Sequence, residues 1–465
     1  MQCCHKYGLF GLLIFLSLQF TESFAQNTID ILDYESIDLI QTGTESLQKI
    51  YKPVLRNDQA LMSCDSAYSY QNTNEIHLFG NIQIETDTEL IWSDTLYYYE
   101  DRDLSNLRGR VVIVQDSSTL YGEKVDYNFF TKIAYFRDGI RLEDPQGTLI
   151  ADRGTYFQNL DSAIFRGNVQ LADTAQYAEG DSLFINRKRQ FLQLYSNIFV
   201  QDSTNQALLT GDFLEADSTG RRFVDGNAYL RRISSDTTDT SHINADQILL
   251  LEEDSSTYIR SYTDVRIWSE RFSSRSDTAL YNSEEEIFRL TASPRAWHKN
   301  IQLTGPFISV QLDSNQVRQL ISYYKPIAVQ EDSVTGRLNQ IKGDTLTVNF
   351  TDGNISTIIL RPDSKVLYHT RNEEGDPDGA VEYISPRTVM YFNEGELQQV
   401  KAGQNQGVFL PEYSGLADRR LEGFSWDPAD RPQKPVMDLS PRFPPVTPDP
   451  PFSLPPKYLF YLKNL

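Results

Sequence analysis

Gly80-Asn81-Ile82-Gln83-Ile84 is the first of five copies of a phrase that decides the fold, all between Leu78 and Val200. The later copies are Gly109-Arg110-Val111-Val112-Ile113, Asp138-Gly139-Ile140-Arg141-Leu142, Gly167-Asn168-Val169-Gln170-Leu171 and Ser196-Asn197-Ile198-Phe199-Val200, and each copy begins 29 residues after the last. A second series keeps the same step: Asp65, Asp94, Glu123, Asp152 and Asp181. Two interleaved registers held over five copies identify a repeat protein.

Each phrase alternates apolar and polar side chains, which is the period of a half-buried β-strand. A 29-residue unit has room for two strands of roughly nine residues each and two tight turns. Suitable turn residues occur at Asp101-Arg102-Asp103, Asp144-Pro145-Gln146-Gly147, Asn186-Arg187-Lys188 and Asp217-Ser218-Thr219-Gly220. The sequence therefore predicts an all-β, elongated slab of antiparallel strands with two strands per repeat.

The ends of the chain differ from the array. Residues 1–25 are typical of a signal peptide, with Lys6, an apolar run and the cleavage motif Ser23-Phe24-Ala25, so we expect export. Residues 26–59 are interpreted as a linker or cap, 60–329 as the repeat domain and 335–410 as a second β-rich block.

The last segment, 411–465, is a proline-rich tail, since 11 of the chain's 20 prolines fall between Pro428 and Pro456. Such composition favours an extended, solvated backbone. The apolar residues 457–465 after it are interpreted as a packing strand or, alternatively, a docking peptide.

Composition argues against several classes of function. The net charge of −21 would repel nucleic acid. Cys3 and Cys4 leave with the signal peptide, so Cys64 alone cannot form a disulfide framework. The five histidines lack metal-ligand spacing, and no nucleophile-elbow, phosphate-loop or dinucleotide motif occurs. We predict a protein that is not an enzyme and holds no cofactor or metal.

The repeated acids need a structural explanation, because a catalytic pair would stand out from its repeat whereas these recur once per unit. We expect each aspartate to sit at a strand start, where its carboxylate accepts hydrogen bonds from nearby backbone and discourages edge pairing.

The phrases at 80–84 and 167–171 resemble those of a known family, together with Ser93-Asp94-Thr95-Leu96-Tyr97-Tyr98 and Ala151-Asp152-Arg153-Gly154-Thr155-Tyr156. This is the OstA-like family of lipopolysaccharide-export proteins, which includes the periplasmic bridge protein LptA and the N-terminal domain of the translocon LptD. The resemblance covers roughly residues 60–325 and recurs in part in 335–410, where a further OstA-like unit is one interpretation.

The resemblance implies an open, V-shaped β-jellyroll whose hydrophobic groove holds lipid A acyl chains in the periplasm. It also implies strand-edge stacking with other OstA-like components and delivery toward an outer-membrane translocon. The segment Ala60–Tyr70 and the block after Gly336 are the edges expected to meet partners. The acidic balance argues against direct steering of an anionic headgroup, which would stay in solvent or meet divalent cations.

The groove candidates are the inward-facing apolar residues of the repeats, with polar residues such as Arg141 on the opposite face. They are Ile82, Ile84, Leu96, Val111, Ile113, Val125, Ile140, Leu142, Val169, Leu171, Leu183, Ile198 and Val200. Alternation alone leaves two interpretations open, the closed core of a sandwich or an open groove.

Two other functions fit parts of the pattern. An outer-membrane β-barrel also uses strands with one apolar face. A polysaccharide-binding β-solenoid would need exposed aromatic platforms, for which Tyr97-Tyr98-Tyr99 and Tyr323-Tyr324 are candidates.

Overall fold

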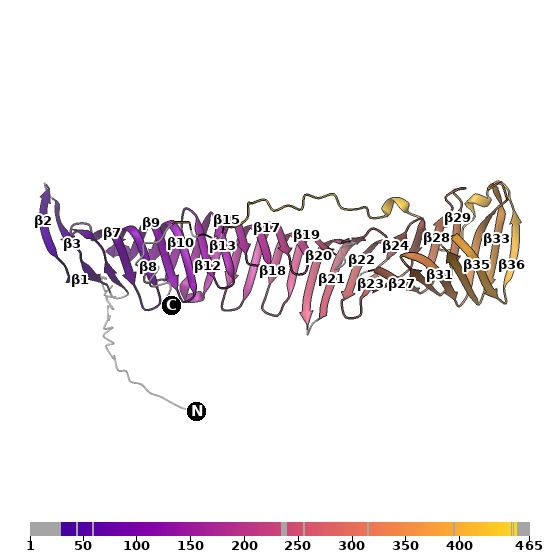
Figure 1. The fold of residues 1–465 in the computed structure, drawn as a ribbon, viewed down its shortest axis with the longest axis horizontal. Coiled ribbons are helices and arrows are strands. Elements are labelled where there is room, and N and C mark those ends of the chain that lie inside the picture. Colours follow the sequence, from indigo (N-terminus) through magenta and orange to yellow (C-terminus); the bar gives the residue numbers. More distant parts are fainter. Residues whose placement is uncertain are drawn as a thin grey trace, which may run out of the picture.

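The protein is a long rod built from a single β-sheet (Figure 1). The computed structural model describes residues 29–452 except 43–44, 58–59, 234–239, 254–255, 314–315, 394–395, 448 and 450. These residues form 36 strands and four short 3-10 helices, and every strand pairing is antiparallel. The predicted all-β, elongated antiparallel fold is therefore confirmed. The predicted signal peptide and residues 457–465 lie outside the described residues.

The first strands come from the segment interpreted as a linker or cap and from the start of the array. They are β1 (Asp30–Asp33), β2 (Ser36–Thr42), β3 (Glu45–Tyr51), β4 (Val54–Arg56), β5 (Leu61–Ser63), β6 (Ser66–Tyr70), β7 (Glu75–Glu85), β8 (Leu90–Tyr99), β9 (Leu104–Gln115), β10 (Ser118–Asn128), β11 (Ile133–Phe136), β12 (Ile140–Asp144), β13 (Gly147–Ala151) and β14 (Arg153–Phe157). The 3-10 helices η1 (Glu100–Arg102) and η2 (Gln158–Leu160) form two of the connections.

The middle of the rod has the longest strands. They are β15 (Ser162–Ala172), β16 (Gln176–Asn186), β17 (Phe191–Asp202), β18 (Ala207–Ala216), β19 (Arg222–Ile233), β20 (Thr240–Glu253), β21 (Ser256–Trp268) and β22 (Ser273–Asn282). Each pairs with the strand before it and the strand after it, so this part of the sheet is a simple meander.

The C-terminal end continues the same sheet in shorter pieces. They are β23 (Ile287–Thr291), β24 (Arg295–His298), β25 (Ile301–Thr304), β26 (Phe307–Asp313), β27 (Gln316–Tyr323), β28 (Ile327–Glu331), β29 (Leu338–Lys342), β30 (Thr345–Thr351), β31 (Asn354–Arg361), β32 (Ser364–Arg371), β33 (Pro377–Ser385), β34 (Arg387–Asn393), β35 (Glu396–Gly403) and β36 (Gln406–Pro411). The helices η3 (Leu416–Asp418) and η4 (Pro428–Asp430) follow.

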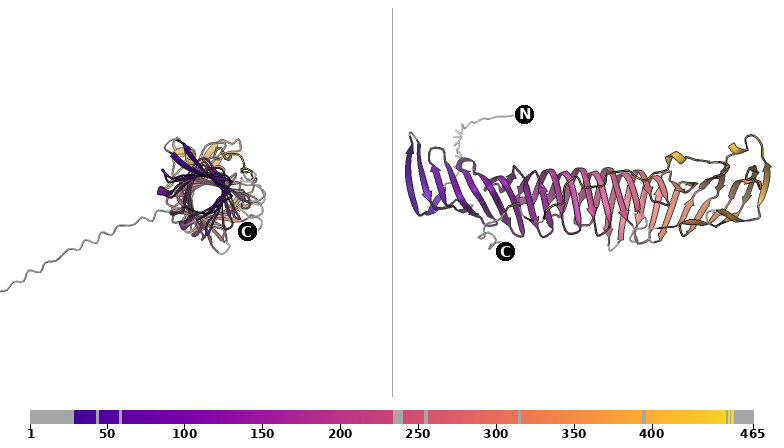
Figure 2. Two further views of the ribbon diagram at one scale, coloured as in Figure 1. Left: turned by 90° about the vertical axis from the view of Figure 1, so that its left-hand side faces the viewer. Right: turned by 45° about the horizontal axis from the view of Figure 1, so that its top comes forward.

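Each long strand bends sharply at its midpoint, and the row of bends forms a crease along the rod. The bends fall at the repeated phrases, where two consecutive residues often take positive φ, such as Gly167 at +77° and Asn168 at +48°. The half-strands on either side of the crease form two arms. Arm 1 contains β6, β11 and β14, and arm 2 contains β5, β12 and β13, so the strands wind around one long axis (Figure 2).

The two interleaved registers of the sequence meet at this crease. The side chain of Asn81 donates to Asp65 at 2.7 Å, Asn197 donates to Asp181 at 2.7 Å, and Arg110 pairs with Asp94 at 2.5 Å. A Cβ on Gly167 would lie 2.3 Å from the carboxylate of Asp152, so glycine is required there for space as well as for φ.

The expectation that the repeated aspartates mark strand starts agrees with Asp65 and Asp152, which directly precede β6 and β14, and is wrong for Asp94 and Asp181, which lie within β8 and β16. All four lie at the crease. There each one joins neighbouring strands: the main-chain nitrogen of Asp152, for example, donates to the carbonyl of Gly167 at 2.9 Å. The acidic series of the sequence therefore marks the residues that contact the bend of the neighbouring strand.

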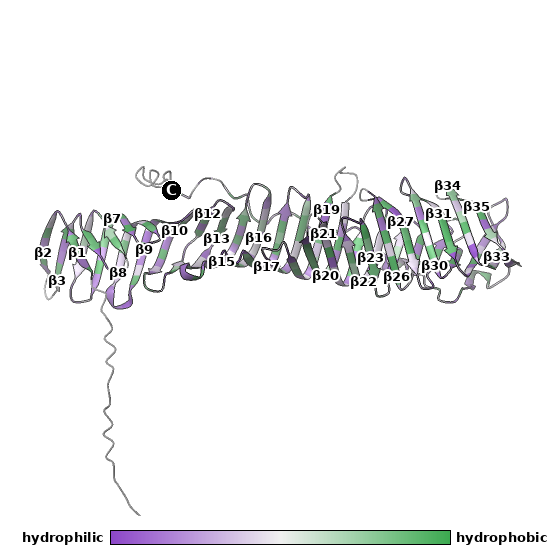
Figure 3. Cartoon of the chain, turned by 90° about the horizontal axis from the view of Figure 1, so that it is seen from below, coloured by the Kyte–Doolittle hydropathy of each residue, from purple (hydrophilic) through white to green (hydrophobic). Residues whose placement is uncertain are grey.

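The core lies between the two arms. Inward-facing residues of both arms form one continuous apolar cluster from Ile50 to Met390, and Figure 3 shows green and purple residues alternating along the strands. Alternation therefore places one face of every strand inside, as the sequence predicts.

The proline-rich tail is extended but lies against the rod, which corrects the expectation of a solvated tail. In Figure 1 it runs from the C-terminal end back over the outer face of the sheet. We call its described part after residue 411 the strap. At its start, Leu416 and Leu421 are buried against strands β28, β32 and β33. Further along, Asp430 pairs with Arg275 and Arg295.

The far end of the strap is fixed to the N-terminal half of the rod. The main-chain nitrogen of Arg442 donates to the carboxylate of Glu179 at 2.9 Å, and its guanidinium donates to Asp181 at 2.9 Å. Phe452 packs against a small outer-face cluster that includes Trp92 and Tyr121. The strap thus links parts of the chain that the strand order keeps far apart.

Of the two expected strand edges, the one at Ala60–Tyr70 is wrong, whereas the block after Gly336 does contain an unpaired edge. The segment Ala60–Tyr70 is interior, because β5 and β6 have partners on both sides. The N-terminal edge is formed instead by β1 and β2, where Leu39 is 76% exposed. The C-terminal edge is formed by β35 and β36, which carry the half-exposed Val408 and Phe409.

Candidate functional site

The N-terminal half of the rod is filled by aromatic side chains. Tyr98, Tyr127, Phe129, Phe136 and Phe165 are at most 1% exposed, and the rings of Tyr127 and Phe129 lie 4.8 Å apart. These large rings, all carried by arm 1, occupy the space between the arms. This part of the interior is a closed core.

The arms separate in the middle of the rod, opposite the crease. We call the line between the turns of the two arms the mouth, and the cavity beneath it from β12 to β21 the mouth groove. It consists of two adjoining hollows of about 350 and 410 Å³ that share Gln176, Val200, Leu209 and Arg222. The apolar residues lining it are Leu142, Leu149, Leu171, Ala172, Ala178, Leu183, Ile185, Leu192, Leu194, Val200, Ala207, Leu209, Leu214, Ala216, Leu230, Leu250 and Ile259.

The groove stays open because its walls carry aliphatic and small residues where the N-terminal half carries rings. On arm 2, Ala178 and Gly180 of β16 face inward, and on arm 1 Ala216 of β18 does so. These side chains cannot span the gap between the arms.

The rim of the groove is polar and mainly acidic. Asp144, Asp173 and Asp202 come from turns of arm 2, while Arg222 and Glu252 come from arm 1. Burial opposes it, but hydrogen bonds, foremost those from Asn205, hold the pKa of Asp202 below its usual range. Arg222 donates to Glu252 at 2.5 Å within its own arm. The site thus combines an apolar interior with a charged edge.

The structure divides the thirteen predicted groove residues into two sets. Leu142, Leu171, Leu183 and Val200 line the mouth groove. The other nine are no more than 3% exposed in the closed core: Ile82, Ile84, Leu96, Val111, Ile113, Val125, Ile140, Val169 and Ile198. Arg141, expected on a polar outer face, is only 6% exposed and pairs with Glu143.

Most of the groove lining was missed by sequence reasoning, including Leu192, Leu194, Leu209 and Leu214. A signal for it exists. Inward positions change from tyrosine and phenylalanine before residue 166 to leucine, alanine and glycine after residue 177. This loss of bulk marks where the interior opens.

The sequence model of the family described as "OstA-like protein" matches residues 27–181. The N-terminal third of the chain is OstA-like. The mouth groove begins inside this OstA-like region, at Leu142, and continues beyond it to Ile259.

Several solved structures resemble part of the chain. One of them is LptH of Pseudomonas aeruginosa, described as the LptA-homologous periplasmic component of the conserved lipopolysaccharide transport device. The identity is 13% and the TM-score 0.24, and the match covers 30% of this chain and 95% of LptH. No curated protein matches.

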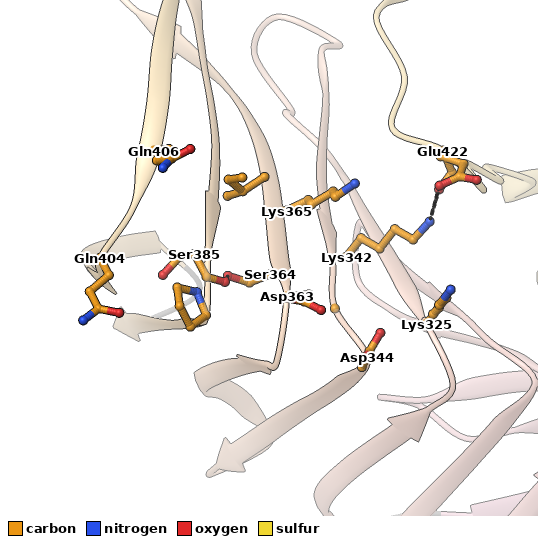
Figure 4. A pocket seen from close by; sticks show the side chains of 13 residues that line it. Lys325, Lys342, Asp344, Asp363, Ser364, Lys365, Ser385, Gln404, Gln406 and Glu422 are labelled. Atoms are coloured by element: carbon orange, nitrogen blue, oxygen red, sulfur yellow. Dashed lines mark hydrogen bonds and ion pairs between the residues drawn. The ribbon is translucent and has the colours of Figure 1, made fainter.

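A second cavity, of about 520 Å³, lies at the C-terminal end beyond the OstA-like region (Figure 4). Lys325, Lys342 and Lys365 line it together with Asp344 and Glu422. Lys342 already donates to the main-chain oxygen of Glu422 at 2.6 Å. Because carboxylates offset the lysines, this cavity has no clear preference for an anion.

Other candidate chemistry is sparse in the described part of the chain. No three histidine, cysteine or acidic side chains are grouped there so that they could hold a metal ion. Nor does that part hold a helix with the length and apolarity to cross a bilayer. Cys64 is buried, and burial raises the pKa of its thiol to about 12. Of the predicted aromatic platforms, Tyr98 is buried whereas Tyr324 is 74% exposed.

Proposed function

We propose that this protein binds lipid acyl chains in the mouth groove and serves in periplasmic lipopolysaccharide transport as a bridge toward the outer membrane. The observation that carries the proposal is the groove itself: an aliphatic interior between two β arms, open along one side and edged by charged residues. The OstA-like region at its N-terminal end supports the same function.

The groove suits acyl chains better than headgroups. A chain of about 12 methylenes offers up to ~10 kcal/mol of gross burial at ~0.8 kcal/mol per methylene, before entropic costs. The acidic rim would instead repel phosphates. A lipid A molecule would therefore be held by its chains, with its headgroup in solvent outside the mouth.

The two ends of the rod suit a bridge. Both end in unpaired strands, and such edges recruit further strands by β-augmentation. Exposed apolar residues, Leu39 at one end and Phe409 at the other, would add burial to the backbone hydrogen bonds. Other OstA-like components and an outer-membrane translocon are the partners we propose for these edges.

Lipid analysis of the purified protein tests the proposal. Organic extracts of protein produced in a lipopolysaccharide-containing host would be analysed by mass spectrometry, beside a Leu209→Glu variant that places a charge in the groove wall. We expect lipid A with the wild-type protein and a loss of at least tenfold in the folded variant. An absence of acyl lipid from the wild type, or equal lipid in both, would contradict the proposal.

A further inference from the structure

The mouth is closed over the N-terminal half of the rod by hydrogen bonds that cross from one arm to the other. The hydroxyl of Tyr127, on arm 1, donates to Glu89 in an arm 2 turn at 2.6 Å. The hydroxyl of Tyr156, on arm 1, donates to Gln115 at the end of an arm 2 strand, also at 2.6 Å. The first bridge is buried, since Tyr127 and Glu89 are at most 3% exposed, and the second is partly buried, since Tyr156 is 4% exposed and Gln115 is half-buried.

In the bridge to Glu89, only one of the two carboxylate oxygens has a hydrogen-bond partner among the described residues. One carboxylate oxygen accepts from Tyr127, while the other is buried without a hydrogen-bond partner among the described residues. Buried polar atoms are nearly always satisfied in native proteins, so an exception calls for a role beyond stability. A pair of apolar residues would close this gap without leaving an oxygen unsatisfied.

The bridge at Tyr156 lies where the closed core meets the groove. In the strand register, Tyr156 on β14 faces Ala163 on β15, and Ala163 faces Ile185 on β16. Ile185 lines the groove, and Ala163 is too small to separate it from the tyrosine ring. An acyl chain that runs along the groove toward the N-terminal end would therefore meet the ring of Tyr156.

We propose that Tyr156, pinned across the mouth by Gln115, is the stop that ends the groove and sets how long an acyl chain it accepts. The inference rests on the proposed function, because it assigns the length selectivity of the same site. Farther from the groove, the bridge between Tyr127 and Glu89 keeps the arms together behind this stop. Chains then enter sideways through the open mouth between β15 and β21.

Binding of saturated fatty acids of 10 to 18 carbons, measured by calorimetry, tests the inference. We expect the wild-type affinity to rise roughly fourfold per methylene and then level off when the chain reaches Tyr156. Tyr156→Ala should continue the rise to longer chains, and Tyr156→Phe, which keeps the ring, should level off as the wild type does. Tyr98→Ala, a matched loss of a buried ring away from the groove, should leave the limit unchanged.

The outcomes separate the two proposals. If the wild type binds no chain of any length, the proposed function fails. If the wild type binds with a length limit that Tyr156→Ala leaves in place, the groove stands and the stop is refuted. Should Tyr156→Ala not fold, a fatty acid carrying a diazirine at its terminal carbon decides with the wild type alone. Labelling of peptides from β13 to β16 supports the stop, and labelling confined to β20 and β21 overturns it.

Discussion

Two neighbouring positions on one strand separate core from groove. Val169 and Leu171 both face inward on β15, two residues apart, but Val169 is fully buried whereas Leu171 is half-buried and lines the mouth groove. An aspartate at 169 would place an unpaired charge in the closed core, which costs about 3–5 kcal/mol. Because typical domains have about 5–15 kcal/mol of stability, Val169→Asp should remove a large share of the free energy of unfolding of this region.

Leu171→Asp should behave differently. Its carboxylate can reach water through the mouth, so we expect a loss of only about 1–2 kcal/mol, from the partly buried leucine side chain. Acyl-chain binding should nevertheless fall by at least tenfold, about 1.4 kcal/mol, because the charge would be dehydrated by a bound chain. Leu171→Asn introduces a side chain of the same shape as aspartate but without its charge, so it should weaken acyl-chain binding less.

Urea unfolding followed by circular dichroism and a fluorescent fatty-acid titration would measure both effects. Equal destabilisation by the two aspartates would mean that the interior is closed at 171 as well. Equal tolerance would mean that water also reaches 169. Either result would refute the division between closed core and mouth groove.

Three further predictions concern the crease, the strap and acid stability. Gly167→Ala should cost about 1–3 kcal/mol in urea unfolding, and Gly139→Ala less, because a Cβ at 139 meets nothing within 4 Å although φ is similar. Arg442→Ala should cost about 1.5–3 kcal/mol and speed proteolysis of the strap, since Glu179 loses its charged donor, the Nε of Arg442, whereas adding Glu179→Gln should recover part of this loss. Burial lowers the pKa of His242 from 6.5 to about 4, so the folded protein binds fewer protons and should lose stability as pH falls from 6.5 to 4. His242→Gln should reduce this loss in unfolding measured across that range, but not abolish it, because burial also lowers the pKa of His298 and His369.

Much of the fold can be predicted from the sequence because the repeat consists of local features, namely alternating apolar residues and turn residues. Alternation sets which face of each strand is inside, and the turn residues set where strands end. The crease was not foreseen, because a bent strand and two successive strands share the same alternation. The facing of Asn81 and Asp65 shows that a constant offset between two registers can mark partners on adjacent strands.

The groove and the strap were harder to predict, for different reasons. An inward-facing apolar residue gives the same alternation pattern whether or not the opposite arm packs against it. The pattern therefore does not distinguish Val169 from Leu171. What separates them is the bulk contributed by other strands, such as the rings of Phe165 and Tyr156. The strap has no periodicity, and its anchors, Arg442 and Phe452, are single residues that meet partners more than 200 positions away.

The strap also gives the protein an order of assembly. Each strand of the sheet can pair as soon as its neighbour exists, so the rod can grow from its N-terminus while the rest of the chain is still emerging. Until the last residues are synthesised, Glu179 lacks Arg442 as its partner, and the cluster around Trp92 is exposed to water because Phe452 does not yet cover it. A shortened chain would complete its sheet and still show these two places, which distinguishes an unfinished molecule from a finished one.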